Sequence, residues 1–220
     1  MNFETAYNLY HDNKSNFDEN FRIKLHRAFS WLKQVENDPN EDLRYICLWI
    51  AFNSVYAKER DSKNSSFTLG ERQSFQRYLS VIGNLDKEER LVKAIRQSLK
   101  SCVLELLENR YTFQPYWDYY NGLKDLKTWD KAFIKAKNLA IRELAQGGTV
   151  NLLTVIFDRL YTLRNQVLHG GSTCGSQINR QALHDGCSIL ETLVPIILEI
   201  MLKKPDTAIW GEPYYPHVHD

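Results

Sequence analysis

The sequence predicts an all-α fold, a helical bundle, and three observations support this prediction. Its long segments place apolar residues three and four positions apart, which puts them on one face of a helix. No segment shows the sustained alternation of apolar and polar residues that is typical of β-strands. Aromatic residues make up 12% of the chain, so a substantial core can form.

The N-terminal part predicts a pair of helices. In the first, apolar residues recur at helical spacing over 21–32, and the Asp38-Pro39-Asn40 cluster marks its end. The second begins near Glu41 and continues to Tyr56. Its middle, residues 46–51, is apolar nearly all round, so we expect this helix to lie deep in the core.

The middle of the chain predicts two further helices and a connection. Thr68 with Glu71 has the spacing of a capping box, which predicts the start of a short helix. Asp86 with Glu89 repeats this spacing and predicts a longer helix. The aromatic stretch 111–120 is predicted to be a packed connection between helices.

Three helices are predicted in the C-terminal part, over residues 128–145, 149–168 and 177–204. Glycine pairs at 147–148 and 170–171 follow the first two, and glycine is common where a helix ends. Thr149 is predicted to cap the second of these helices. Pro205 follows the last one, and Pro195 within it predicts a kink.

With 220 residues, the chain is long enough for one large domain or a domain with an insertion. We expect residues 1–204 to form a single all-α domain. Within it, residues 61–121 are predicted to be a helical insertion between the N-terminal helix pair and the C-terminal helices. Residues 205–220 are rich in proline and aromatic residues, and we expect this tail to lie over the surface or to reach a partner.

Charge and cysteine content exclude several classes of protein. The chain has 28 Lys+Arg and 27 Asp+Glu, so any contact with nucleic acid must use a local patch. Its 4 cysteines have neither zinc-finger nor disulfide-scaffold spacing.

The N-terminus lacks an apolar signal segment, and the most apolar stretch, 189–202, is too short to span a bilayer. We expect a cytoplasmic protein that uses no cofactor and no membrane partner.

The segment 159–171 gathers polar side chains that can carry out chemistry. Asn165 and His169 are four residues apart on one helix face, so the carboxamide can reach and orient the imidazole. Arg164 and His169 are five residues apart, about 140° around an ideal helix. They converge only where the helix ends at His169, and Gly170-Gly171 provides that end.

An arginine, an amide and an imidazole at one helix end suit phosphodiester chemistry. Arginine can hold a phosphate with two hydrogen bonds and stabilise the charge of the transition state. Histidine, with a reference pKa of about 6.5, can move the protons.

These residues resemble the motif of the HEPN superfamily, in which Arg, a polar residue, three further positions and then His end a helix of an all-α domain. The segment Leu48-Trp49-Ile50-Ala51-Phe52-Asn53-Ser54-Val55-Tyr56 is also similar to the early helix of Apea-like and related bacterial HEPN proteins. The Arg-to-His spacing alone is a weak signal. The following Gly-Gly and the Trp-x-x-Phe-Asn-x-x-Tyr pattern make the resemblance more specific.

The resemblance implies an RNA endonuclease that needs no metal and acts as a homodimer through the motif helix. Such proteins belong to phage defence and toxin–antitoxin systems, which implies an antitoxin or another defence protein as a partner. His169 would be the general acid/base, Arg164 the phosphate-binding cation and Asn165 the residue that positions the catalytic group. The RNA 2′-hydroxyl would attack the adjacent phosphate and leave a cyclic phosphate. Some members are modified on a tyrosine two residues after the histidine, and this chain has Gly171 there.

A structural interpretation of the same residues stays open. Arg164 can be an ion-pair partner on the helix surface, and His169 can cap the last carbonyls of its helix. The matching function is a non-catalytic, dimeric HEPN-like module that binds RNA, a nucleotide or a partner protein. The near-neutral charge favours this alternative. A third is a helical scaffold that docks through its tail.

Four further residues are candidates for binding substrate or supporting the site. Arg159 is predicted to bind substrate as part of a basic patch, or else to pair with an acid. Asn53 supports the site or belongs to a buried hydrogen-bond network. Gly170 and Gly171 support the site by ending its helix.

The other chemical motifs are weak. The loop 171–175 is a near miss for a nucleophile elbow, lacks the ending of a P-loop, and fits a flexible connection. His217, His219 and Asp220 form a short cluster at a chain end, where we expect no metal site. Cys174 has no neighbouring histidine except His169 to activate it.

Overall fold

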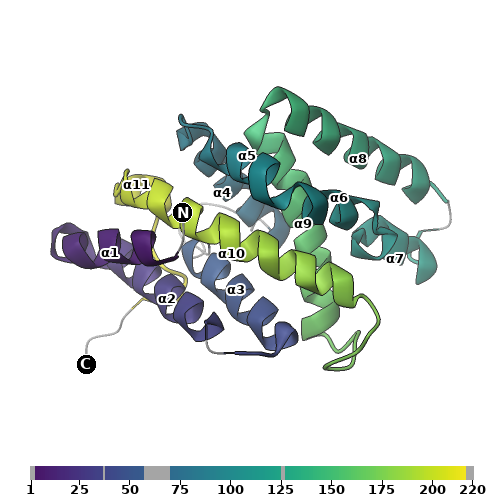
Figure 1. Cartoon of the computed structure of the whole chain (residues 1–220), viewed down its shortest axis with the longest axis horizontal. Coiled ribbons are helices and arrows are strands. Elements are labelled where there is room, and N and C mark those ends of the chain that lie inside the picture. The colour runs from purple at the N-terminus through teal and green to yellow at the C-terminus, as the bar shows by residue number, and fades with distance from the viewer. Residues whose placement is uncertain (1–2, 37, 57–69, 125–126, 217–220) are drawn as a thin grey trace.

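The computed structural model describes residues 3–36, 38–56, 70–124 and 127–216, and in these ranges it contains helices and no β-strand (Figure 1). The N-terminal half forms α1 (Phe3–Asn13), α2 (Glu19–Val35), α3 (Glu41–Tyr56), α4 (Glu71–Leu85), α5 (Arg90–Ala94) and α6 (Lys100–Glu108). The rest forms α7 (Gln114–Tyr120), α8 (Trp129–Gln146), α9 (Thr149–Leu168), α10 (Arg180–Leu202) and α11 (Thr207–Trp210). The predicted all-α class is confirmed.

The N-terminal helix pair is α2 and α3. Asp18 begins α2, since its carboxylate accepts the N–H of Asn20 over 2.9 Å. The middle of α3 lies in the core, with Leu48, Trp49 and Ala51 all buried, as the apolar segment predicts. The preceding helix, α1, was not predicted, because its only buried side chains are Ala6 and Tyr10.

The middle segment differs from the prediction in two places. Asp86 does cap the next helix, with its carboxylate accepting the N–H groups of Arg90 and Leu91 over 2.9 Å. Glu89 does not complete a capping box, because it has a left-handed φ of +53° outside the helix. The aromatic stretch after residue 110 is not only a connection but contains α7, which has Pro115 in its first turn. Thr68 lies outside the described residues.

The C-terminal helices agree with their predicted ranges to within three residues. Gly147 ends α8 with a left-handed φ of +88°. The cap of α9 is Gly148 rather than Thr149. α10 begins at Arg180 instead of residue 177 and continues as one helix through Pro195.

The tail returns to the body of the protein. Trp210 of α11 is only 1% exposed, and its indole N–H donates to the carbonyl of Lys204 over 2.6 Å. Lys24 of α2 in turn donates to the carbonyl of Trp210 over 3.3 Å. This part of the tail is therefore packed into the core and does more than cover the surface.

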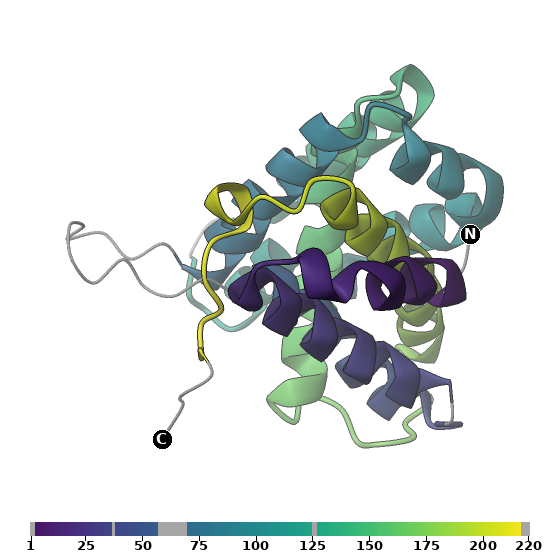
Figure 2. The ribbon, with the colours of Figure 1, turned by 90° about the vertical axis from the view of Figure 1, so that its left-hand side faces the viewer.

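The arrangement of the helices places α9 in the middle of the molecule, with the loop that follows it at the start of α3. In Figure 1, α7 and α8 occupy the opposite end of the molecule from α1, α2 and α11, with α9 and α10 between them. One cluster of buried apolar side chains includes residues of α1 to α6 and of α8 to α11. Figure 2 shows the loop after α9 running below the start of α3. Within the described residues, no helix is long and apolar enough to cross a membrane.

Candidate functional site

The candidate site lies at the C-terminal end of α9. The N–H of His169, the cap residue, donates to the carbonyl of Asn165 over 3.0 Å. Gly170 has a left-handed φ of +69°, which glycine adopts without strain. The N–H of Gly171 donates to the carbonyl of Gln166 over 2.7 Å, and a Cβ on Gly171 would lie 3.1 Å from that oxygen. The two glycines therefore end α9 where the sequence predicts.

Arg164 forms an ion pair with Glu71, the first residue of α4. Its Nη1 lies 3.3 Å from Oε2 of Glu71, and its Nη2 lies 3.2 Å from Oε1. Nη1 also donates to Oδ1 of Asn165 over 3.0 Å. The side chain is only 17% exposed. Arg164 is thus an ion-pair partner within the chain, one of the two interpretations that the sequence leaves open.

Glu71 joins two tyrosines to this arginine, and we name Glu71, Arg164, Tyr56 and Tyr161 the Glu71 cluster. The hydroxyl of Tyr56 donates to Oε1 of Glu71 over 2.9 Å, and that of Tyr161 donates to Oε2 over 3.2 Å. Burial raises the pKa of both tyrosines, and the nearby carboxylate raises it further. The guanidinium of Arg164 also lies 5.9 Å from the ring of Trp49. The cluster therefore holds Arg164 in one place.

His169 is exposed, and its imidazole has no hydrogen bond or ion pair within the described part of the chain. The predicted bond from Asn165 to this ring is absent. The carboxamide oxygen of Asn165 instead accepts from Arg164, because the two side chains are neighbours at the last turn of α9. His169 is thus the free group of the motif, whereas Arg164 and Asn165 bind each other.

Arg159 occupies neither of its predicted environments. It is 1% exposed, so it forms no surface patch, and no acid pairs with it in the described structure. Its guanidinium lies 4.2 Å from the ring centroid of Phe113 and 4.6 Å from that of Phe133. Burial lowers its pKa to about 10. Arg159 is therefore not part of an exposed basic patch, because the two rings cover its guanidinium.

Asn53 is half-buried on α3, and its carboxamide has no hydrogen bond to any described residue. The predicted buried network is therefore not formed. Asn53 stands four residues after Trp49 and three before Tyr56, so it shares the face of α3 that contacts the Glu71 cluster.

Metal-binding groups do not gather in the structure. Among the described residues, no three His, Cys, Asp or Glu side chains lie close enough to hold a metal ion. His217, His219 and Asp220 lie outside those residues. Cys174 is exposed, and its thiol accepts from Asn40 over 3.6 Å.

The residue that sequence reasoning missed is Glu71. Its position in the sequence predicts only a capping box, whereas its carboxylate contacts three side chains of the candidate site. The position of Tyr161 could have been predicted from the sequence. It lies three residues before Arg164 and so shares its helix face. No sequence pattern around Glu71 predicts that its side chain contacts α9.

Compared with protein-family models, with curated proteins and with solved structures, the chain matches none of them. Evidence for a function of this chain therefore comes from the motif and from the geometry of this site.

Proposed function

We propose that the protein is a metal-independent RNA endonuclease of the HEPN type that acts as a cytoplasmic homodimer in a defence or toxin–antitoxin system. One observation supports this above the others. At the end of α9, the imidazole of His169 is exposed and has no partner among the described residues. It lies five residues after Arg164, which Glu71 holds in place. A free histidine near a fixed cation suits phosphodiester cleavage.

The reaction uses the RNA itself as the nucleophile. The imidazole of His169 takes the proton of the 2′-hydroxyl, whose oxygen then attacks the adjacent phosphorus. The bond from phosphorus to the 5′-oxygen breaks, and a protonated imidazole returns a proton to that oxygen. The products are a 2′,3′-cyclic phosphate and a 5′-hydroxyl. A homodimer supplies two copies of His169, one to take the proton and one to return it.

Arg164 contributes a positive charge at the edge of the site. Because both of its terminal nitrogens lie within ion-pair distance of the Glu71 carboxylate and its side chain is 17% exposed, we assign Arg164 a limited contact with phosphate. Asn165 keeps the guanidinium in place and does not orient His169.

A second candidate function is the non-catalytic module that binds RNA, a nucleotide or a protein. It is favoured by the same ion pair, since an acid of the same chain neutralises Arg164, and by the burial of Arg159. The two functions make opposite predictions for cleavage by the wild-type protein.

The test is cleavage of a mixed RNA in EDTA by wild type and by His169→Ala. We expect the wild type to give cyclic-phosphate ends and the variant to be slower by about 10²- to 10⁴-fold, the usual contribution of general acid–base catalysis. A substrate with one deoxyribose should resist cleavage at that position, because the attacking hydroxyl is missing.

The matched control is His26→Ala, which removes another exposed histidine, on α2, and should cleave at the wild-type rate. Equal rates for wild type and His169→Ala would refute the assignment of His169. No cleavage by the wild type, together with retained RNA binding, would favour the non-catalytic module.

A further inference from the structure

The Glu71 carboxylate lies among donors that suit an anion. Its two oxygens face the terminal nitrogens of Arg164 and accept the hydroxyls of Tyr56 and Tyr161, over distances of 2.9–3.3 Å. The Nε of Arg164 is also buried and has no hydrogen-bond partner. The Glu71 cluster is therefore rich in donors. An arginine together with hydroxyl groups is also a donor set that can hold a phosphate.

A second ion pair between the same two helices shows that the pair of Glu71 and Arg164 is a long one. Arg72 of α4 contacts Asp158 of α9 over 2.8 Å from its Nε and 2.7 Å from its Nη2. Bonds between charged groups usually measure about 2.7–2.9 Å. The distances between Arg164 and Glu71 are 3.2 and 3.3 Å. The Glu71 pair is therefore the weaker of the two and the easier one to open.

Glu71 is also the member of this pair that lies nearer to solvent. Its side chain is 35% exposed, against 17% for Arg164. Tyr56, which donates to the same carboxylate, is only 3% exposed. A change of rotamer can therefore move the Glu71 carboxylate into water without a change in the helix. The donors then stay in place without an anion.

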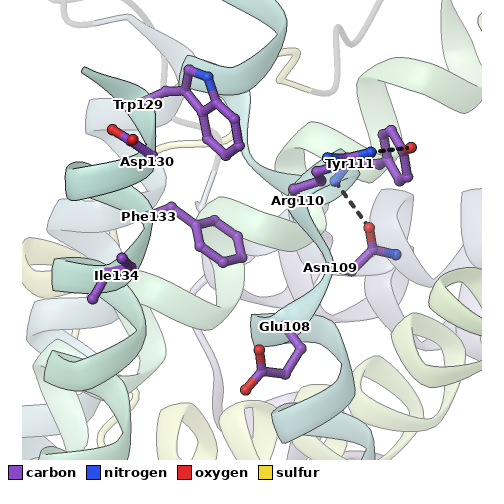
Figure 3. A pocket seen from close by; sticks show the side chains of 8 residues that line it. All are labelled: Glu108, Asn109, Arg110, Tyr111, Trp129, Asp130, Phe133 and Ile134. Carbon is purple, nitrogen blue, oxygen red and sulfur yellow. Dashed lines mark hydrogen bonds between the residues drawn. The ribbon is translucent and has the colours of Figure 1, made fainter. Parts of the chain in front are cut away.

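The end of α9 is held by contacts that do not involve Glu71. The side-chain amide of Gln166 donates to the carbonyl of Tyr111. Asn179 forms bonds to both Gln166 and Asn109, over 3.3 and 3.4 Å. The side chain of Asn109 in turn accepts the N–H of Tyr111 over 2.9 Å, as Figure 3 shows. We therefore expect the end of α9 to keep its shape when Glu71 moves.

A phosphate is the anion that the proposed reaction brings to this place. Arg164 and His169 are five residues apart, which is about 7.5 Å along the axis of a helix. One RNA strand can therefore contact both. A phosphodiester carries one negative charge, as the carboxylate does, and its free oxygens accept from the same donors. It can replace Glu71 without leaving the buried donors unpaired.

We propose that the Glu71 carboxylate occupies the place of an RNA phosphate, and that a bound RNA strand displaces it from Arg164. This inference rests on the proposed function for its choice of RNA as the ligand. It makes Glu71 an internal competitor, which lowers the affinity for RNA. It also explains why the arginine of a cleavage motif is paired with an acid in the free protein.

The test measures binding of a fluorescently labelled single-stranded RNA with 2′-O-methyl riboses, which the proposed reaction cannot cleave. Glu71→Gln keeps the shape of the side chain and removes its charge. We expect this variant to bind RNA about 5-fold more tightly, the upper end of what a partly exposed ion pair contributes. A plot of log affinity against log salt should steepen by about 0.7, the value for one more phosphate contact on a single strand.

The matched control is Glu88→Gln, which removes an exposed acid paired with Lys203 and changes the net charge by the same amount. It should bind RNA like the wild type. The double variant Glu71→Gln/Arg164→Gln should lose the gain, because the cation that holds the phosphate is missing. Neutral methylphosphonate linkages in the probe should remove the difference between Glu71→Gln and the wild type.

A second measurement uses the wild-type protein and so does not depend on how the variant folds. On addition of the same RNA, the NMR signal of the Glu71 carboxyl carbon should move to the position of an exposed glutamate. An unchanged signal at saturating RNA would overturn the proposal. So would equal or weaker RNA binding by a folded Glu71→Gln, or no RNA binding by either protein. A gain for inorganic phosphate but not for RNA would assign the site to a free anion and would also overturn it.

The outcomes for this inference and for the proposed function can be told apart. RNA cleavage that needs His169, without any gain in Glu71→Gln, would remove the internal competitor and leave the nuclease. A gain in RNA binding without cleavage by any of the proteins would do the reverse. Where cleavage is observed, Glu71→Gln should lower KM and leave kcat unchanged, whereas loss of a residue that only positions Arg164 would lower kcat.

Discussion

Arg159 carries a positive charge in the core and forms no ion pair with any described residue. Both of its terminal nitrogens are buried and have no hydrogen-bond partner. A buried cation of this kind loses its hydration, and the rings of Phe113 and Phe133 together with the nearby charge of Asp158 compensate in part. Its pKa of about 10 keeps it charged at neutral pH. The folded protein therefore carries the free-energy cost of burying this charge at neutral pH.

We expect Arg159→Met to leave the free energy of unfolding within about 1 kcal/mol of wild type or to increase it. Methionine keeps the contacts with the two rings and removes the buried charge. Arg159→Ala should be about 2 kcal/mol or more less stable than Arg159→Met, because it leaves a cavity. Urea unfolding of the three proteins measures this. If Arg159→Met lost as much stability as Arg159→Ala, the charge itself would be stabilising.

The sequence predicts the residues of the motif better than their partners. Gly170 and Gly171 end α9 as expected, because the end of a helix depends on adjacent residues. The pairing of Arg164 with Glu71 joins positions 93 residues apart, and only packing of α4 against α9 brings them together. Arg159 was misjudged because the helical spacing does not reveal which aromatic side chains cover a helix face.

At the scale of elements, the loop after α9 is attached to the start of α3 by acids. Asp42 accepts the N–H of Gly175 over 3.1 Å and Nη1 of Arg180 over 2.9 Å. One residue earlier, Glu41 contacts Nδ1 of His184 over 2.8 Å. The first turns of α3 and α10 are therefore held together by bonds that depend on charge.

The hydrogen bond to Glu41 raises the pKa of His184 above its usual value. A histidine with a raised pKa in the folded state adds stability below its unfolded pKa of about 6.5, and this contribution disappears as pH rises through the folded pKa. We expect His184→Gln to be destabilised more at about pH 5.5 than at about pH 8.5. The effect should be small, because His184 is 58% exposed.

An NMR titration of the histidine ring protons checks this directly. In Glu41→Gln the pKa of His184 should fall toward the unfolded value. An identical pKa for His184 in wild type and Glu41→Gln would exclude Glu41 as the cause.

Element boundaries were predictable where local signals are strong. The ends of α3, α8 and α9 agree with the sequence because capping residues and apolar periodicity lie within each helix. α1 buries only two side chains, so it has little periodicity to detect. α7 is seven residues long and has no buried residue, and its aromatic rings pack instead with α8. Such packing depends on how the helices are arranged in the fold, so the sequence of the segment alone does not predict it.

At the scale of the whole molecule, the end of α9 exposes apolar side chains. Leu168 is 46% exposed, and Ile178 in the following loop is 79% exposed. We expect these two exposed groups on either side of His169 to form an apolar patch that a second copy covers. In a two-fold dimer the same patch meets its own copy, which would bring the two His169 side chains toward one axis. The proposed nuclease needs such an arrangement.

We expect the wild type to sediment as a dimer and Ile178→Glu to sediment as a monomer, because a charge buried in an apolar interface is costly. The variant should also lose RNA cleavage if the active site is completed by both copies. Leu123→Glu is the matched control, since Leu123 is a similarly exposed apolar residue, 73% exposed after α7; it should remain dimeric and active. Sedimentation velocity at several concentrations and cleavage in EDTA give both results. A wild-type protein that cleaves RNA as a monomer would place the complete site within one chain, and one His169 would then have to take and return the proton.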